Sequence, residues 1–287
     1  MRTLRGMPRR AFTLVELLVV IAIIGTLIGL LVPALGVVQA TSRATGSQSN
    51  LRQWGMGTLM YADHHKQRLP WEGKKDAADM ETNLAERSYW ANAVPPFVGQ
   101  KSYIEVIDEA INGGVEIPMA PGSKSIFVDP AASTEMDAPY EFGPVIANGR
   151  QRAFSFNYVP NSELNNTYLA EAGITQNTPN YTMSLNIMRE LNQTILMLEM
   201  RGTKDELPGT DIHHGLDLDR HRCDWKRFAN RHFDGGHLLY GDNHVAHETN
   251  RRLITNRQGS TDPATPGGDW NKGGFVWDPL GPATDQP

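Results

Sequence analysis

The chain has 287 residues, of which 40% are hydrophobic and 21% are charged, and its formal net charge is −5. Its mean hydropathy is −0.41 and its isoelectric point is about 6.0, so most of the chain is soluble and no basic face for nucleic acid is expected. The one cysteine, Cys223, excludes a framework of intrachain disulfides. Because the chain contains 27 Gly and 18 Pro, its globular part should be rich in loops, which excludes a simple helical bundle.

The N-terminus is basic and is followed by a long apolar run. Residues 1–11 contain four arginines and no acidic residue, and residues 12–38 contain one charged side chain, Glu16. The 26 positions between Glu16 and Arg43 hold no charge, whereas a helix needs roughly 20 apolar residues to span a bilayer. The arginines should keep the N-terminus in the cytoplasm. We therefore expect a leader peptide (1–11) and a single transmembrane helix (12–38) in the inner, cytoplasmic membrane, with the C-terminal part exported.

A motif at the start of the apolar run resembles a known processing site. Residues 10–16, Arg-Ala-Phe-Thr-Leu-Val-Glu, are similar to the cleavage site of type IV prepilins and type II secretion pseudopilins. The resemblance implies that a prepilin peptidase cuts between Ala11 and Phe12 and that Phe12 is then N-methylated. It also implies that Glu16 neutralises the N-terminal amine of an adjacent pilin or pseudopilin subunit. Ala11 is a departure, because this family strongly prefers Gly before the cut.

Two alternatives to this interpretation remain open. Glu16 lies near the edge of the apolar run, where a charge in the bilayer costs less than at its centre, so it could be a tolerated interfacial charge. Residues 9–12, Arg-Arg-Ala-Phe, also resemble a twin-arginine export signal, for which residues 38–40 offer a small-residue cleavage site. The second alternative predicts a secreted domain without the apolar helix.

Two glycines and a proline interrupt the predicted transmembrane helix. Gly25 and Gly29 are four residues apart, a spacing that allows close helix–helix contact in lipid, although glycine is common in membrane helices generally. Pro33 removes a helix hydrogen bond and should kink the segment. Proteins similar to the pilins carry a proline at about this place, which implies local melting of the helix during filament assembly.

The helix should continue beyond the membrane. Residues 39–66 show a rough apolar face, since Leu51, Trp54, Leu59 and Tyr61 recur at three-to-four-residue spacing. A long N-terminal helix, half in lipid and half packed on a domain, is the architecture that the pilin resemblance implies.

An exported globular domain is expected over residues 67–257, with a Gly/Pro-rich tail at 258–287. A short helix is predicted at 81–94, ended by two prolines. Strands are predicted at 125–128, 153–159, 194–200, 236–240 and 244–247, the last two joined by the turn Gly241-Asp242-Asn243. The expected fold class is therefore α+β and pilin-like: a long helix packed on a small antiparallel sheet with loop-rich insertions. The tail is either disordered or docked through its aromatic residues.

Seven of the nine histidines fall between residues 213 and 247, in two groups interspersed with acids. The groups are Asp211, His213, His214, Asp217, Asp219 and His221, and His232, His237, Asp242, His244 and His247. Imidazole and carboxylate are metal ligands, so this density would suit zinc or another transition metal. No His-Glu-x-x-His spacing is present, however, and ordinary surface histidines are the preferred interpretation.

A second resemblance lies in the same segment. His232, nine residues, then Asp242-Asn243-His244-Val245 is similar to a C-terminal His-(nine residues)-Asp-Gly motif of large, uncharacterised prepilin-like proteins. Asn243 replaces the glycine of that motif, but Asn also tolerates a left-handed turn. We expect Asp242 to fix the turn and His232 to contact it across the hairpin. Some pseudopilins of this type bind calcium through loop acids, which makes Asp217, Asp219 and Asp242 the candidate ligands.

The sequence favours a structural subunit over an enzyme. No Gly-x-Ser-x-Gly elbow and no phosphate-binding Gly-Lys-Ser/Thr loop occurs, and no cofactor is expected apart from calcium or zinc as candidates. The expected function is that of a type IV pilin or type II secretion pseudopilin subunit, whose partners are the prepilin peptidase, other subunits and the lipid bilayer, with no nucleic acid. The alternative is a membrane-tethered metal-binding protein or metalloenzyme that uses the 211–247 cluster.

Overall fold

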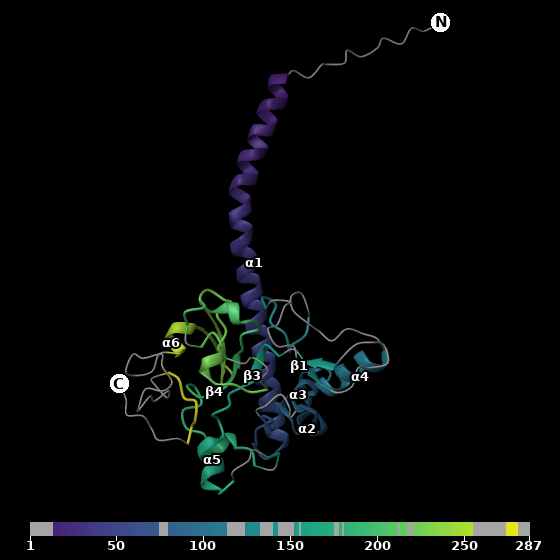
Figure 1. The fold of residues 1–287 in the computed structure, drawn as a ribbon, viewed down its shortest axis with the longest axis vertical. Coiled ribbons are helices and arrows are strands. Elements are labelled where there is room, and N and C mark those ends of the chain that lie inside the picture. The colour runs from purple at the N-terminus through teal and green to yellow at the C-terminus, as the bar shows by residue number, and fades with distance from the viewer. Residues whose placement is uncertain are drawn as a thin grey trace. The chain divides into compact units, whose positions relative to one another are not determined.

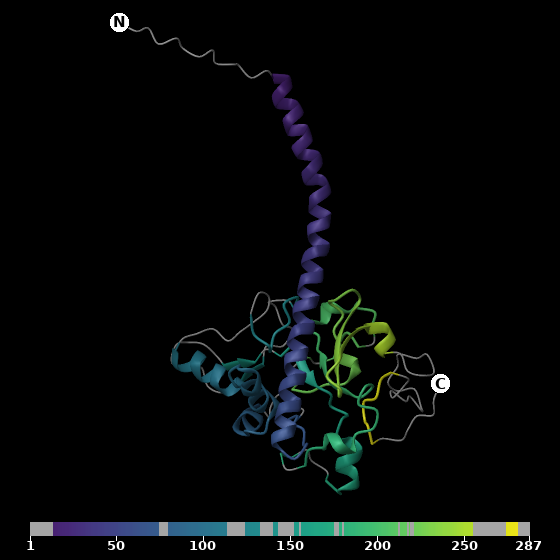
Figure 2. The same ribbon diagram turned by 180° about the vertical axis from the view of Figure 1, so that it is seen from behind.

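The computed structural model of the protein divides into two compact units, Met1–Ser42 and Arg43–Pro287. It describes residues 14–74, 80–113, 124–132, 140–142, 152–154, 156–174, 178–179, 181–211, 213–216, 218, 221–254 and 274–280. Figure 1 and Figure 2 show the ribbon from opposite sides. The described part of the first unit is helical, and the described strands all belong to the second unit.

Helix α1, Leu14–His64, is the long N-terminal helix that the apolar run predicts. Its side chains in the first unit are exposed, including the large apolar ones between Leu14 and Val38. The helix is long and apolar enough to cross a membrane, judged by length and composition. Pro33 lies inside α1 and does not end it.

The helix ends two residues before the predicted limit at residue 66. Lys66 and Gln67 adopt positive φ angles of 58° and 62°, which a right-handed helix does not accommodate. The backbone N–H of Gln67 donates to Ala62 O at 2.7 Å and satisfies a carbonyl of the last turn.

The part of α1 in the second unit contributes side chains to that unit's hydrophobic core. Leu51 and Trp54 are fully buried and Tyr61 is nearly so, which confirms the predicted apolar face. Trp54 packs against Trp90 and Phe127, with ring centroids 5.0 and 5.2 Å apart. Aromatic pairs at these separations stabilise a fold by more than the burial of their apolar area alone.

The second unit contains a four-stranded antiparallel sheet with strand order β3-β4-β5-β6. Its strands are β3 (Tyr158–Pro160), β4 (Ile195–Glu199), β5 (Gly235–Tyr240) and β6 (Val245–Thr249). Every residue of β3, β4 and β5 is buried, whereas β6 at the sheet edge is mostly half-exposed. The predicted strands at 194–200 and 236–240 are confirmed, and so is the α+β class with a long N-terminal helix and a small antiparallel sheet.

Short helices and a two-stranded sheet complete the described elements. They are α2 (Met80–Ala85), α3 (Trp90–Ala93), η2 (Pro95–Val98), α4 (Tyr103–Gly113), β1 (Tyr140–Phe142), β2 (Arg152–Phe154), α5 (Asn166–Glu171), η3 (Leu185–Ile187), η4 (Lys204–Glu206), η5 (Trp225–Arg227) and α6 (Asn250–Ile254). Within the second unit, the four-stranded sheet and helices α2–α4 lie on opposite sides of α1 (Figure 1 and Figure 2).

Two predicted elements are divided in the structure. The single helix expected at 81–94 becomes α2 and α3, because the segment between them pairs with Trp71. The N–H of Trp71 donates to Ser88 O at 2.7 Å, and the N–H of Trp90 donates to Trp71 O at 2.8 Å. The strand expected at 153–159 is likewise divided, between β2 and β3.

The prediction of a strand at 125–128 is wrong, because this segment forms turns. Side chains of α1 bind carbonyls that a strand ladder would need. Trp54 Nε1 donates to Ile126 O at 2.7 Å, and Asn50 Nδ2 donates to Val128 O at 3.2 Å. Contact with the helix therefore outweighs the local preference of these residues for an extended strand.

Part of the Gly/Pro-rich tail docks on the sheet. Phe275 and Trp277 are buried, and the backbone of Val276 pairs with the start of β4, accepting the N–H of Ile195 at 2.9 Å. Among the described residues of the tail, 274–280, the docked alternative is therefore confirmed.

Candidate functional site

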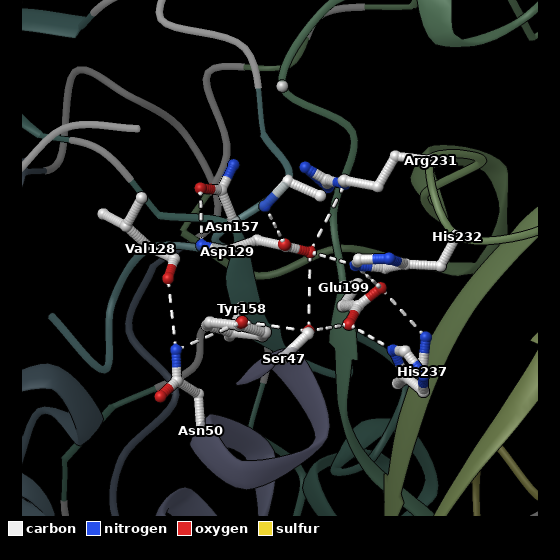
Figure 3. A network of polar contacts seen from close by, with 12 residues as sticks. Ser47, Asn50, Val128, Asp129, Asn157, Tyr158, Glu199, Arg231, His232 and His237 are labelled. Carbon is white, nitrogen blue, oxygen red and sulfur yellow. Dashed lines mark hydrogen bonds and ion pairs between the residues drawn. The ribbon is translucent and has the colours of Figure 1, made fainter. Parts of the chain in front are cut away.

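Buried polar side chains meet where α1, the 124–132 segment and the four-stranded sheet come together (Figure 3). We call them the carboxylate–histidine cluster, which consists of Ser47, Asp129, Tyr158, Glu199, Arg231, His232 and His237. None of these side chains is more than 6% exposed. Buried ionisable groups are costly unless they are paired, so their contacts decide what the cluster can do.

Glu199, the last residue of β4, accepts contacts from two directions. Its Oε1 lies 2.7 Å from His237 Nδ1 and within hydrogen-bond distance of Ser47 Oγ. Its Oε2 accepts the backbone N–H of His237 at 3.0 Å. Ser47 Oγ also lies 3.0 Å from Tyr158 Oη, so α1, β3, β4 and β5 meet at this carboxylate.

Asp129 is the second buried carboxylate. Its Oδ2 lies 2.9 Å from His232 Nε2 and 3.5 Å from Arg231 Nε, and its Oδ1 accepts the backbone N–H of Ala131 at 2.7 Å. Burial alone would raise the pKa of Asp129, but the charge of Arg231 and the hydrogen bond with His232 outweigh it and lower the pKa. Asp129 is therefore ionised at neutral pH.

His232 lies between the two carboxylates. Its Nε2 is 2.9 Å from Asp129 and 3.9 Å from Glu199 Oε2. Burial alone would lower the pKa of His232, but the hydrogen bond with Asp129 and the charge of Glu199 raise it above its ordinary value. The neighbouring cation, Arg231, also pairs with Glu206, since its Nη1 lies 3.5 Å from Glu206 Oε1. The cluster therefore favours a further positive charge at the imidazole.

Residues 232–237, at the start of β5, place both histidines beside Glu199. The two residues after His232 have positive φ angles of 48° and 61°, and His232 and Gly235 exchange backbone hydrogen bonds at 2.9 and 3.0 Å. A Cβ at Gly236 would lie 2.7 Å from Glu199 Oε2, so the carboxylate needs glycine at that position. The run His-Phe-Asp-Gly-Gly-His thus forms a tight turn followed by a close approach to β4.

The predicted contact between His232 and Asp242 is not formed. Asp242 lies in the exposed turn between β5 and β6, where its Oδ1 accepts the backbone N–H of His244 at 3.1 Å and lies 2.5 Å from His244 Nδ1. Asp242 therefore fixes the turn, as predicted, and Asn243 adopts the left-handed conformation with φ 70°. His232 instead contacts Asp129, 103 residues earlier in the chain.

The first predicted histidine group does not converge within the described part of the chain. Asp217 and Asp219, two of the calcium candidates, lie outside the described residues. His221 is buried with its Nδ1 3.2 Å from Tyr89 Oη, and burial lowers the pKa of His213. Both imidazoles are therefore buried, and the preferred interpretation of surface histidines is wrong for them.

Neither Asp129 nor Glu199 is among the site residues predicted from the sequence. Glu199 carries a detectable signal, since it is the one charged residue in the apolar run 194–200. A lone carboxylate in a buried strand requires a partner. Asp129 lies in an irregular segment and carries no comparable signal.

The predicted processing site, Ala11 and Phe12, lies outside the described residues. Glu16 lies in the first turn of α1, where the helix dipole favours a carboxylate. The large apolar side chains between Leu14 and Val38 are 43–77% exposed in the chain. An apolar surface of this extent requires a cover of lipid or protein.

Comparison with known proteins supports the N-terminal motif. A family model for the prokaryotic N-terminal methylation motif matches residues 6–32. No curated protein and no solved structure is significantly similar to the chain. The chain therefore carries a prepilin-like leader, and this leader together with the apolar helix α1 indicates a membrane-anchored protein. The likeness of residues 232–245 to a C-terminal motif of large prepilin-like proteins stays a prediction.

Proposed function

We propose that this protein is a structural subunit of a type IV pilus or type II secretion pseudopilus, with no catalytic role of its own. The observation that carries the proposal is the methylation motif at 6–32, followed by a helix whose apolar side chains are exposed from Leu14 to Val38. In the proposed route, the prepilin peptidase cuts before Phe12 and methylates the new N-terminus. Residues 12–38 anchor the protein in the inner membrane with the second unit exported.

Assembly would then bury the exposed helix surface against other subunits. Burial of apolar surface contributes about 25 cal/mol per Å², so a row of large exposed aliphatic side chains is a strong driving force once subunits leave the lipid. Gly25 and Gly29 lie on this exposed part of α1, where their lack of a side chain would let a neighbouring helix approach closely.

Glu16 would set the register between subunits. A carboxylate in an apolar environment is tolerable only when it is paired, and the N-terminal amine of Phe12 in a neighbouring subunit is a suitable cation. Each subunit would then be held in a fixed axial position relative to the next. The second unit would form the filament surface or contact secreted cargo.

A cross-linking experiment in membranes tests the role of Glu16. The wild type and Thr26→Ala should give a ladder of cross-linked oligomers, because the Thr26 hydroxyl only donates to Ala22 O of its own helix at 2.9 Å. Glu16→Gln removes the charge at nearly constant volume and should reduce the ladder at least about ten-fold, the equivalent of 1.4 kcal/mol. An unchanged ladder in Glu16→Gln would show that Glu16 is only an interfacial charge.

A further inference from the structure

Glu199, His232 and His237 form a ligand set of the kind that binds transition metals. Each offers one ligand atom, and these atoms lie within 4.8 Å of one another. The three side chains are 0%, 2% and 1% exposed. Zinc sites commonly use two imidazoles and a carboxylate, with a fourth position for water or another donor. We propose that these three residues bind a divalent transition-metal ion, with Zn²⁺ as the best fit.

The surrounding contacts hold the ligands in place. Ser47 Oγ and the backbone N–H of His237 contact the two oxygens of Glu199, as Figure 3 shows. The carbonyl of His232 lies 2.6 Å from His247 Nε2, which anchors the turn that carries the first imidazole. Contacts of this kind orient metal ligands, and their loss typically costs 10–100-fold in affinity.

The charge of the cluster also favours a cation. Asp129 and Glu199 are both buried, and Arg231 divides its charge between Asp129 and Glu206 at 3.5 Å each. A divalent ion beside neutral imidazoles would neutralise the two carboxylates. A proton on His232 would do so in part, and the experiment must separate a metal ion from a proton.

The chemistry of the ligands selects among metals. Imidazole nitrogen suits zinc, copper, iron and nickel, whereas Ca²⁺ takes six to eight oxygen ligands. The proposed site therefore differs from a calcium site built on loop acids. Asp129 Oδ2, which is 2.9 Å from His232 Nε2, is a further oxygen donor beside these ligands. Because all of these groups are buried, we expect the ion to be bound during folding and to exchange slowly with a chelator.

Metal content of the full-length protein tests the proposal. The chain is produced in zinc-supplemented medium, extracted with detergent, purified without a metal-binding tag and measured by inductively coupled plasma mass spectrometry. We expect about one zinc ion per chain, and a loss of at least about ten-fold in His237→Gln. His244→Gln is the matched control, because His244 is a half-exposed histidine of the same hairpin, paired with Asp242, and should retain the ion.

Zinc K-edge X-ray absorption of the wild type provides a test that needs no variant. It should show two imidazole ligands with Zn–N distances of about 2.0 Å. The proposal is overturned if the wild type, refolded with Zn²⁺, Co²⁺ or Ni²⁺, holds no metal, in which case the positive charge is a proton on His232. It is also overturned if a folded His237→Gln variant keeps its zinc, or if the spectrum lacks imidazole. None of these results depends on leader cleavage or filament assembly.

Discussion

Trp54→Ala should strongly destabilise the second unit, because Trp54 ties α1 to the segment that carries Asp129. Trp54 is fully buried against Trp90 and Phe127, and truncating such a side chain costs about 3–5 kcal/mol. Its Nε1 also donates to Ile126 O at 2.7 Å, and loss of that hydrogen bond adds about 1 kcal/mol. The expected loss, about 4–6 kcal/mol, is a large part of the 5–15 kcal/mol that stabilises a typical domain.

Urea unfolding of the detergent-extracted full chain, followed by far-ultraviolet circular dichroism, measures this loss. Met60→Ala is the matched control, because Met60 lies on the same helix but is 48% exposed, so its truncation should cost less than about 0.5 kcal/mol. Trp54→Phe should fall between the two, since it keeps a ring but loses the hydrogen bond. If Trp54→Ala and Met60→Ala lowered the free energy of unfolding equally, the packing of α1 on this core would be refuted.

Three further predictions concern the sheet and the cluster. Folding raises the pKa of His232 above 6.5, so the contribution of His232 to stability is complete below about pH 6.5 and is lost as pH rises through its folded-state pKa. Folding lowers the pKa of Asp129 below 3.8, so the contribution of Asp129 to stability is lost only as pH falls through its folded-state pKa. Thermal melts of the metal-free protein should therefore show an alkaline decline in Tm that His232→Gln lacks, and an equal decline in that variant would contradict the assignment. Gly236→Ala should lower the free energy of unfolding by about 1–3 kcal/mol, while Gly209→Ala, with nothing near the added Cβ, should change it by less than about 0.5 kcal/mol. Asn243→Gly should leave the free energy of unfolding in urea unchanged or raise it by up to about 1 kcal/mol. Glycine adopts the φ of 70° at this position without strain, and the substitution removes a buried Oδ1 that has no partner among the described residues. A large decrease in the free energy of unfolding would disprove this.

The features that depend on neighbouring residues could be predicted from the sequence. The uncharged run after Glu16 predicts the long helix, and the turn Gly241-Asp242-Asn243 between two apolar runs predicts the β5–β6 hairpin. In both cases the signal and the structure lie within the same short segment. The methylation motif at 6–32 is of the same kind, since it is read from consecutive residues.

The features that depend on distant residues could not be predicted. Residues 125–128 have a strand-like composition, but Asn50 and Trp54 of α1 bind their carbonyls and hold them in turns. His232 has a plausible partner in the nearby hairpin, yet the fold places it against Asp129 and Glu199, which no local pattern connects with it. The carboxylate–histidine cluster is therefore a product of tertiary packing.

The mass of the mature N-terminus is the most direct test of a pilin-like subunit. Mass spectrometry of the membrane-extracted protein from its native host should find a chain that begins at Phe12 and is heavier by one methyl group. A chain that begins near Thr41 would instead support a secreted domain released from an export signal. An intact N-terminus at Met1 would contradict processing by a prepilin peptidase and would leave the apolar helix as a simple membrane anchor.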